Sequence, residues 1–249
     1  MKKSGEEKKR RRKKKNYLLR LFLVLLFSGA LYGIANTSYF NVTTIEVVGN
    51  FHYEAAEVVQ LSKLKTGGNL FRLDKEERIS MLKQDPYIRD VEIKRKLPDT
   101  VIIHVEERRE DAAVAYGESY VLIDLDGMVL RRIDQEPEVP LLVGMTLLQM
   151  QPGFPLEVQE VTVLENTLVL LSAMEDNDLF FKKIDISNVI IKAYIYDRLV
   201  CEGRPENILE AMKNGSLQLV LAELMAEGIQ YGTLYLGGKG YCSFSPQVQ

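Results

Sequence analysis

The sequence has few of the residues from which enzyme active sites are built. It contains two His, two Cys and no Trp among 249 residues. His52 and His104 stand in no H-E-x-x-H pattern, which excludes a zinc-protease site of that kind. Gly67-Gly68 is not followed by Gly-Lys-[Ser/Thr], so it predicts a turn and not a phosphate-binding loop. A Gly-x-Ser-x-Gly motif is missing as well. The sequence therefore predicts no catalytic, cofactor-binding or metal-binding residues.

Cysteine is too scarce to indicate a disulfide framework. Cys201 and Cys242 lie in separate strand-like runs. Two thiols can form one disulfide if their strands are neighbours. Buried free thiols that pack as small apolar groups fit the sequence at least as well. Both interpretations stay open at this point.

Charge is unevenly distributed along the chain: the first 20 residues are strongly basic and the remainder is acidic. Residues 1–20 hold eleven Lys and Arg against two Glu, a net charge of +9. The whole chain has a net charge of −3, so the remainder carries −12. Between the two parts, Leu21–Ile45 contains no charged residue. Because about 20 residues at 1.5 Å each cross a hydrocarbon core of about 30 Å, we predict a transmembrane helix over residues 17–36.

The basic residues before the span predict its orientation. By the positive-inside rule the amino terminus is cytoplasmic, and the acidic domains lie outside a single-pass cell-membrane protein. The alternative is a cleaved signal peptide, since Gly33-Ile34-Ala35 resembles a processing site. We favour a retained span because the apolar run and the charged segment before it are both long for a signal peptide.

The basic tail contains eight consecutive Lys and Arg, Lys8–Lys15. Such a block before a span sets topology and attracts anionic lipid of the inner leaflet. We favour that role over nucleic-acid binding or a specific cytoplasmic partner, and we expect residues 1–16 to be disordered. The residues predicted to contact lipid are Arg10, Arg11, Arg12, Lys13, Lys14 and Lys15.

The most regular stretch is YIRDVEIKRKLPDTVIIHVEER, residues 87–108. Its apolar residues alternate with polar ones on both sides of Pro98-Asp99, which predicts a β-hairpin with one apolar face. A strand is expected over residues 42–48, and helices over about 53–61 and 74–84, the second capped by Asp74 with Glu77. This order predicts a three-stranded sheet that buries two helices and leaves one edge strand free.

The second half predicts a mixed α+β domain over residues 113–246, followed by a tail at 247–249. Asp126-Gly127 predicts a hairpin turn, and Asn214-Gly215 a break within the last helical region. Strands are expected at 113–116, 120–124, 128–132, 139–143, 184–186, 189–200, 232–236 and 241–244, and helices at 156–174 and from Pro205 to Gly228.

Several motifs carry a family resemblance. N-L-F-R-L-D at Asn69–Asp74 and the segment Pro86–Ala112 follow the span, and Y-V-L-I-D-L-D-G-M-V-L-R-R begins the second half. In this order they resemble the FtsQ/DivIB family of bacterial cell-division proteins over nearly the whole chain, although Glu110-Asp111 stands where the family usually has Pro. The resemblance implies a POTRA domain over residues 40–112 and the family's β domain over 113–246.

The resemblance also implies a function. A member of this family is expected to be a bitopic divisome scaffold, required for septum formation and enriched at the septum. It would bind FtsB/DivIC-like and FtsL-like membrane coiled-coil proteins, and other septal wall-synthesis proteins. One alternative is a POTRA-type polypeptide-binding module for secretion, which would normally be repeated or fused to a barrel. A membrane-anchored envelope enzyme is disfavoured because no catalytic constellation is present.

A free sheet edge is the expected binding site, because its unpaired N–H and C=O groups can accept a partner strand. Candidate edges lie in the first module and at the carboxyl-terminal strand. The family commonly has D-L-R-x-P-D there, whereas this sequence reads Y-L-G-G-K-G-Y, so contacts do not transfer residue by residue. The alternative role for the aromatics is core packing. The residues predicted to bind a partner are Tyr235, Tyr241, Cys242, Ser243 and Phe244.

Overall fold

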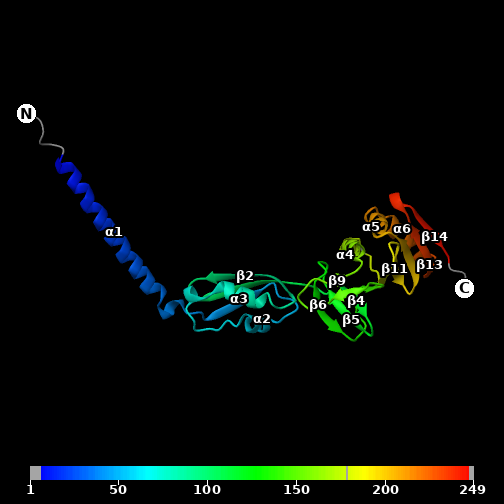
Figure 1. Ribbon diagram of the computed structural model, residues 1–249, viewed down its shortest axis with the longest axis horizontal. Coiled ribbons are helices and arrows are strands. Elements are labelled where there is room, and N and C mark those ends of the chain that lie inside the picture. The colour runs from blue at the N-terminus through cyan, green and yellow to red at the C-terminus, as the bar shows by residue number, and fades with distance from the viewer. Residues whose placement is uncertain (1–6, 178, 247–249) are drawn as a thin grey trace, which may run out of the picture. The chain divides into compact units, whose positions relative to one another are not determined.

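The computed structural model describes residues 7–177 and 179–246 of the chain (Figure 1). It divides into two compact units. The first comprises residues up to 82 and residues 90–106, and the second comprises residues 83–89 and those from 107 onward. Eight strands between Ile88 and Val158 follow one another without an intervening helix, whereas helices and strands are mixed in the rest of the chain, so the α+β class expected from the sequence is confirmed.

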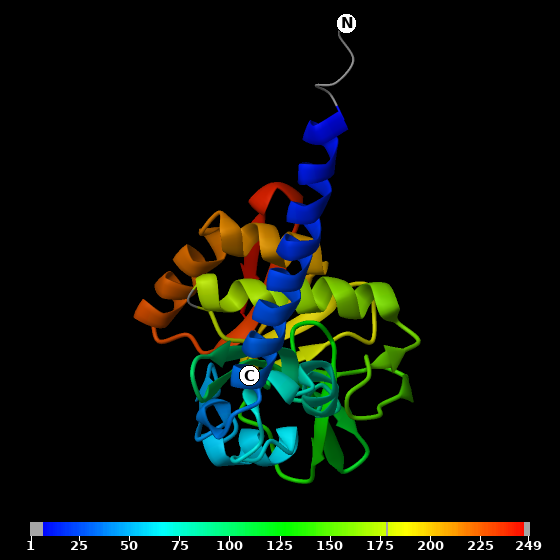
Figure 2. The ribbon, with the colours of Figure 1, turned by 90° about the vertical axis from the view of Figure 1, so that its left-hand side faces the viewer.

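The first unit opens with one continuous helix, α1, from Glu7 to Ala35 (Figure 2). Its segment Tyr17–Ala35 has 19 residues with a mean hydropathy of 2.1 and exposed side chains, and it is long and apolar enough to cross a membrane. The predicted disorder is not found in residues 7–16, which are helical, while residues 1–6 lie outside the described part. Lys and Arg are good helix formers and no Gly or Pro intervenes, so the helix extends outward from its apolar segment.

The rest of the first unit is a three-stranded sheet with two helices. The elements are β1 (Thr44–Val48), α2 (Ala55–Ser62), α3 (Lys75–Leu82), β2 (Ile88–Lys96) and β3 (Thr100–Glu107). The strand order is β1-β3-β2, with β1 parallel to β3, so β1 and β2 are the edges. The predicted hairpin and helices are therefore present. Side chains from both helices, from the short 3₁₀ turn between them and from both hairpin strands form the core: Val58, Leu70, Leu82, Ile93, Val101 and Ile103.

Local hydrogen bonds decide where these elements begin. Asp74 accepts from the backbone N–H of Glu77 at 3.1 Å, as predicted for the start of α3. Strand β1 begins at Thr44 and not at Val42, because Val42 exchanges backbone hydrogen bonds of 2.8 Å with the Gly67-Gly68 turn. Pairing with the Gly67-Gly68 turn therefore makes β1 shorter than the strand predicted over residues 42–48.

The second unit is built on a nine-stranded sheet in the order β14-β13-β12-β11-β10-β7-β4-β5-β6. Its strands are β4 (Ala112–Tyr116), β5 (Ser119–Ile123), β6 (Val129–Ile133), β7 (Leu141–Val143), β10 (Lys183–Asp185), β11 (Ile191–Tyr196), β12 (Arg198–Gly203), β13 (Tyr231–Leu236) and β14 (Cys242–Ser245). A separate pair is formed by β8 (Leu147–Gln149) and β9 (Glu157–Val158).

One face of this sheet is covered by three helices, α4 (Val161–Asp176), α5 (Pro205–Lys213) and α6 (Ser216–Ala226) (Figure 1). A fully buried row crosses the sheet in register beneath them: Leu142, Ile184, Ala193, Cys201 and Leu234. The neighbouring row points to the other face and includes Lys183, Tyr194, Val200 and Thr233, which are partly exposed. The core therefore lies between the helices and one sheet face.

Two predictions in the second unit are wrong. The helix expected from residue 156 begins at Val161, because the preceding backbone pairs elsewhere: Leu156 donates to Gly127 and Gln159 donates to Thr146. The strand expected over 189–200 is two antiparallel strands, β11 and β12, that reverse at Asp197. Backbone pairing outside a helix determines the first result, and a local reversal determines the second. The break at Asn214-Gly215 is confirmed, with Gly215 at φ 77° between α5 and α6.

Candidate functional site

The last strand, β14, is an edge of the nine-stranded sheet and pairs with β13 on its inner side. The prediction that the carboxyl-terminal strand forms an edge is therefore confirmed. In the antiparallel register Tyr235 stands opposite Ser243 and Leu234 stands opposite Phe244. This register places all five residues of the predicted binding site on or beside one edge.

The five residues nevertheless divide between two faces of the sheet. Cys242 and Phe244 are partly buried against the helix-covered core. The ring of Phe244 lies so close to Gly232 that a Cβ at that glycine would come within 2.4 Å of it. Tyr235 and Tyr241 are exposed. Core packing is thus the role of Phe244 but not of the two tyrosines.

Backbone groups of β14 are directed away from β13 at alternate residues. Gly237 donates to the carbonyl of Tyr241 at 2.8 Å, which marks that pair as hydrogen-bonded. In an antiparallel ladder bonded and non-bonded pairs alternate, so Tyr235–Ser243 is the next bonded pair. The N–H and C=O groups of Cys242 and Phe244 therefore point toward the outer side of the sheet, where a further strand can pair.

The glycine loop that departs from the family pattern is packed on α5. Gly238–Gly240 forms a tight turn in which Lys239 has the left-handed φ of 63°. The backbone N–H of Lys239 donates to Glu210 at 3.3 Å, and a Cβ at Gly240 would come within 2.6 Å of the Asn214 amide. Gly240 has φ 70°, a conformation that glycine adopts without steric cost. The glycines thus let the chain cross α5 closely before β14 begins.

Both cysteines are free thiols. Cys201 lies in β12 and Cys242 in β14, and β13 separates the two strands. The neighbouring strands that a disulfide requires are therefore not present. Burial raises the pKa of the Cys201 thiol far above its ordinary value, and burial also raises the pKa of the Cys242 thiol. Both thiols act as apolar packing groups in this fold.

The basic residues predicted to contact lipid, Arg10 to Lys15, lie within α1, directly before its apolar segment. Their side chains are outside the described part of the structure. Their helical backbone places them on the amino side of the candidate span, as the sequence order requires.

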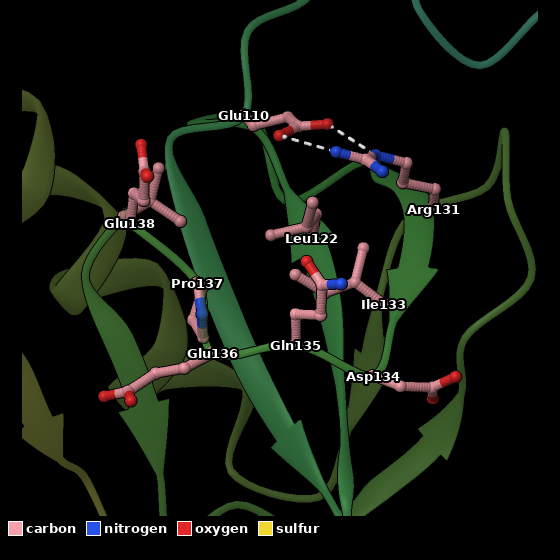
Figure 3. A pocket seen from close by; sticks show the side chains of 10 residues that line it. Glu110, Leu122, Arg131, Ile133, Asp134, Gln135, Glu136, Pro137 and Glu138 are labelled. Carbon is pink, nitrogen blue, oxygen red and sulfur yellow. Dashed lines mark hydrogen bonds and ion pairs between the residues drawn. The ribbon is translucent and has the colours of Figure 1, made fainter.

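A pocket of about 600 Å³ lies beside β5 and β6 (Figure 3). At one end Arg131 donates to both carboxylate oxygens of Glu110, at 2.7 and 3.3 Å, and Glu110 accepts from the Tyr87 hydroxyl at 2.5 Å. Burial and then the bond to Glu110 raise the pKa of Tyr87, while the Glu110 bond raises that of Arg131. The acidic segment 134–138 forms another wall. Sequence reasoning missed this pocket, although three carboxylates within five residues marked the segment.

None of the ten residues that line the pocket is His, Ser, Thr or Cys. Within the described residues, no group of three or more His, Cys, Asp and Glu side chains is placed to hold a metal ion. His52 stacks edge-to-face on Tyr53, and His104 lies in β3.

Comparison with known proteins agrees with this arrangement. Residues 40–108 match the model of the POTRA domain, FtsQ-type. Cell division protein DivIB of Clostridium acetobutylicum is 30% identical over 194 residues, which cover 76% of this chain and 77% of that protein. The chain belongs to the FtsQ/DivIB family.

Other members of the FtsQ/DivIB family are similar over shorter stretches. DivIB of Clostridium botulinum strain Hall is 30% identical over 176 residues, 68% of each chain. FtsQ of Syntrophotalea carbinolica is 27% identical over 146 residues, 58% of this chain and 50% of that protein. This FtsQ/DivIB protein therefore has a role in cell division, and it is not an enzyme, as the family consists of non-enzymatic division proteins. With α1 it is a single-pass membrane protein.

Proposed function

We propose that this FtsQ/DivIB protein is a bitopic scaffold of the divisome, required for septum formation and enriched at the septum. Its amino terminus is cytoplasmic, with the basic residues of α1 against anionic lipid of the inner leaflet. The POTRA domain and the second domain are extracytoplasmic. There they bind FtsB/DivIC-like and FtsL-like membrane coiled-coil proteins, and through them other septal wall-synthesis proteins.

The edge strand β14 is the observation that carries this proposal. Its outward N–H and C=O groups at Cys242 and Phe244 are available to a partner strand. The exposed Tyr235 and Tyr241 flank the same edge and provide aromatic contact area, which is favoured at interfaces. A strand of the partner would extend the sheet to ten strands, and side-chain contacts with the tyrosines would set its register.

The membrane span contributes to such binding through concentration. Each hydrogen bond added at the edge contributes only about 0.5–1.5 kcal/mol, so a strand of a few residues binds weakly by itself. Proteins confined to one membrane meet at a much higher effective concentration than in solution. We therefore expect stable assembly in membranes even where the isolated domains bind weakly.

Cys242→Pro tests the edge directly. Proline removes the outward N–H of residue 242 and leaves the bonded Tyr235–Ser243 pair in place, as edge strands tolerate. Cys242→Ala is the matched control, because it removes the same thiol and keeps the N–H. With the purified full chain in detergent and a purified FtsB/DivIC-like protein, Cys242→Pro is expected to weaken binding about tenfold relative to Cys242→Ala.

Folding of both variants is checked by circular dichroism and by the inaccessibility of Cys201 to alkylation. Equal binding by two folded variants would move the partner site to another edge, with β1 and β2 of the POTRA domain examined next. Absence of binding by the wild-type chain contradicts the scaffold proposal itself.

A further inference from the structure

We propose that the POTRA domain carries a second interaction surface, which docks on the lipid surface of the membrane that α1 crosses. Phe71 and Leu97 enter the interfacial layer there, beside the end of the span. The proposal depends on the membrane span and not on partner binding at β14. It also holds for either orientation of α1, because it concerns the carboxyl-terminal end of that helix.

The loop that follows α2 is tied to the end of α1. The side-chain amide of Asn69 donates to the carbonyl of Ala35 at 2.9 Å and to that of Thr37 at 3.5 Å. The guanidinium of Arg72 donates to the side-chain oxygen of Asn36 at 3.0 Å. A helix leaves its last carbonyls without partners, and here a loop more than thirty residues further along the chain supplies one. The same Asn69 side chain accepts from the N–H of Phe71 at 3.0 Å, which fixes the loop.

The tip of the β2–β3 hairpin lies at the same end of the domain. Thr43 donates its backbone N–H to the carbonyl of Asp99 at 2.9 Å and its hydroxyl to the Asp99 carboxylate at 2.5 Å. Arg95 donates to the carbonyls of Leu70 and Leu73, both at 2.8 Å. Residues 36–43, 65–73 and 95–99 therefore form one surface, called here the span-side end.

Large apolar side chains are exposed on each of the three segments of the span-side end. Tyr39 is 68% exposed, Phe71 45% and Leu97 62%. Tyr39 and Phe71 both stack edge-to-face on Phe40, each at 5.1 Å between ring centroids. Exposed Arg72 adds a cation to this surface. Aromatic side chains with a neighbouring cation are typical of protein segments at the headgroup level of a bilayer.

The length of the span argues for lipid as the occupant. The 19 residues of Tyr17–Ala35 reach about 28 Å at 1.5 Å per residue, close to the hydrocarbon thickness of about 30 Å. Ala35 then lies at the boundary of the hydrocarbon core, and the polar layer beyond it is several Å thick. A loop hydrogen-bonded to the Ala35 carbonyl lies inside that layer. The span-side end thus meets lipid headgroups before any soluble partner.

The absence of Trp from the chain makes a direct test possible. Phe71→Trp and Leu97→Trp each introduce a single tryptophan, 36 and 62 residues beyond Ala35, respectively. The full chain is reconstituted in phosphatidylcholine and phosphatidylglycerol vesicles, with and without brominated acyl chains. Phe51→Trp is the matched control, because Phe51 is 58% exposed and follows the far end of β1, a strand about 17 Å long.

We expect brominated lipid to quench Phe71→Trp and Leu97→Trp at least about twofold more strongly than Phe51→Trp, with emission at shorter wavelength. Circular dichroism confirms that each variant is folded. The proposal is overturned if brominated lipid quenches both variants no more strongly than it quenches Phe51→Trp. It is equally overturned if the emission of Leu97→Trp shifts only after a coiled-coil division protein is added, since the surface would then be a protein-binding site.

Discussion

At the scale of single residues, Gly49 shows how one backbone position fixes the POTRA fold. It has φ 90°, and a Cβ there would come within 2.2 Å of the Val105 carbonyl oxygen on β3. Gly49→Ala therefore combines backbone strain with a clash against backbone. We expect it to lower the free energy of unfolding of the POTRA domain by about 2–4 kcal/mol.

Gly67→Ala is the control for this prediction. Gly67 has a similar φ of 92°, but a Cβ there has no atom within 4 Å. Gly67→Ala should lower the free energy of unfolding by only about 1 kcal/mol, because it introduces backbone strain but no clash. Thermal unfolding of the full chain in detergent, followed by circular dichroism, measures both variants. Equal losses would mean that close approach to Val105 does not constrain the turn.

The buried thiol of Cys201 and the hydroxyl of Tyr87 predict that the protein loses stability at high pH. Burial raises the folded-state pKa of Cys201, and burial with the Glu110 bond raises that of Tyr87. As pH rises past their ordinary values of 9.0 and 10.0, the unfolded chain releases these protons while the folded chain retains them. Stability therefore falls with rising pH, by at most about 1.4 kcal/mol per pH unit for Cys201.

The midpoint of urea unfolding of the second unit, measured from about pH 8 to about pH 10.5, tests this expectation. Cys201→Val removes one of the two groups and should flatten the decline. A midpoint that decreases equally in the wild type and in Cys201→Val would show that the thiol does not contribute.

At the scale of elements, the start of α3 depends on one carboxylate. Asp74 accepts from the Glu77 N–H at 3.1 Å. Asp74→Ala leaves this donor without its partner and should cost about 1 kcal/mol, whereas Asp74→Asn keeps an acceptor and should cost much less. Thermal unfolding distinguishes the two. Similar losses for both variants would assign the effect to charge near the helix amino terminus and not to the hydrogen bond.

Elements with a clear local turn signal were predictable, and elements without one were not. The β2–β3 hairpin follows from alternation around Pro98-Asp99, and the α5–α6 break from Asn214-Gly215. The β11–β12 reversal is marked only by Asp197-Arg198, without Gly, Pro or Asn, in a run that is otherwise apolar apart from Lys192. The β8–β9 pair joins segments that lie close in the chain, but no alternating pattern marks them, and the backbone before α4 pairs there instead of extending the helix.

The candidate site was predictable in place but not in detail. The position of the last strand in the chain and its aromatics indicated an edge. Which side chains face the core depends on the register with β13, which places Phe244 inward and Ser243 opposite Tyr235. The sequence of β14 alone does not determine this register, because a strand of four residues is too short for its alternation to show which side chains face the core.

At the scale of the whole molecule, the division of charge and the span organise the protein. A basic segment, one apolar helix and an acidic remainder of net charge −12 follow one another along the chain. The POTRA domain is hydrogen-bonded to the end of the span through Asn69 and Arg72. The end of the span therefore fixes the position of the span-side end of the POTRA domain, in addition to anchoring the chain.

Cell division itself gives the most direct test of the scaffold proposal. In cells depleted of their own copy, the wild-type chain, Cys242→Ala and Cys242→Pro are expressed as fluorescent fusions at equal levels. We predict that the wild type and Cys242→Ala restore septation, whereas Cys242→Pro reaches the membrane, fails to retain the FtsB/DivIC-like protein at the septum and leaves cells filamentous. Normal septation and normal partner recruitment with Cys242→Pro would contradict the assignment of β14 as the edge on which the division complex assembles.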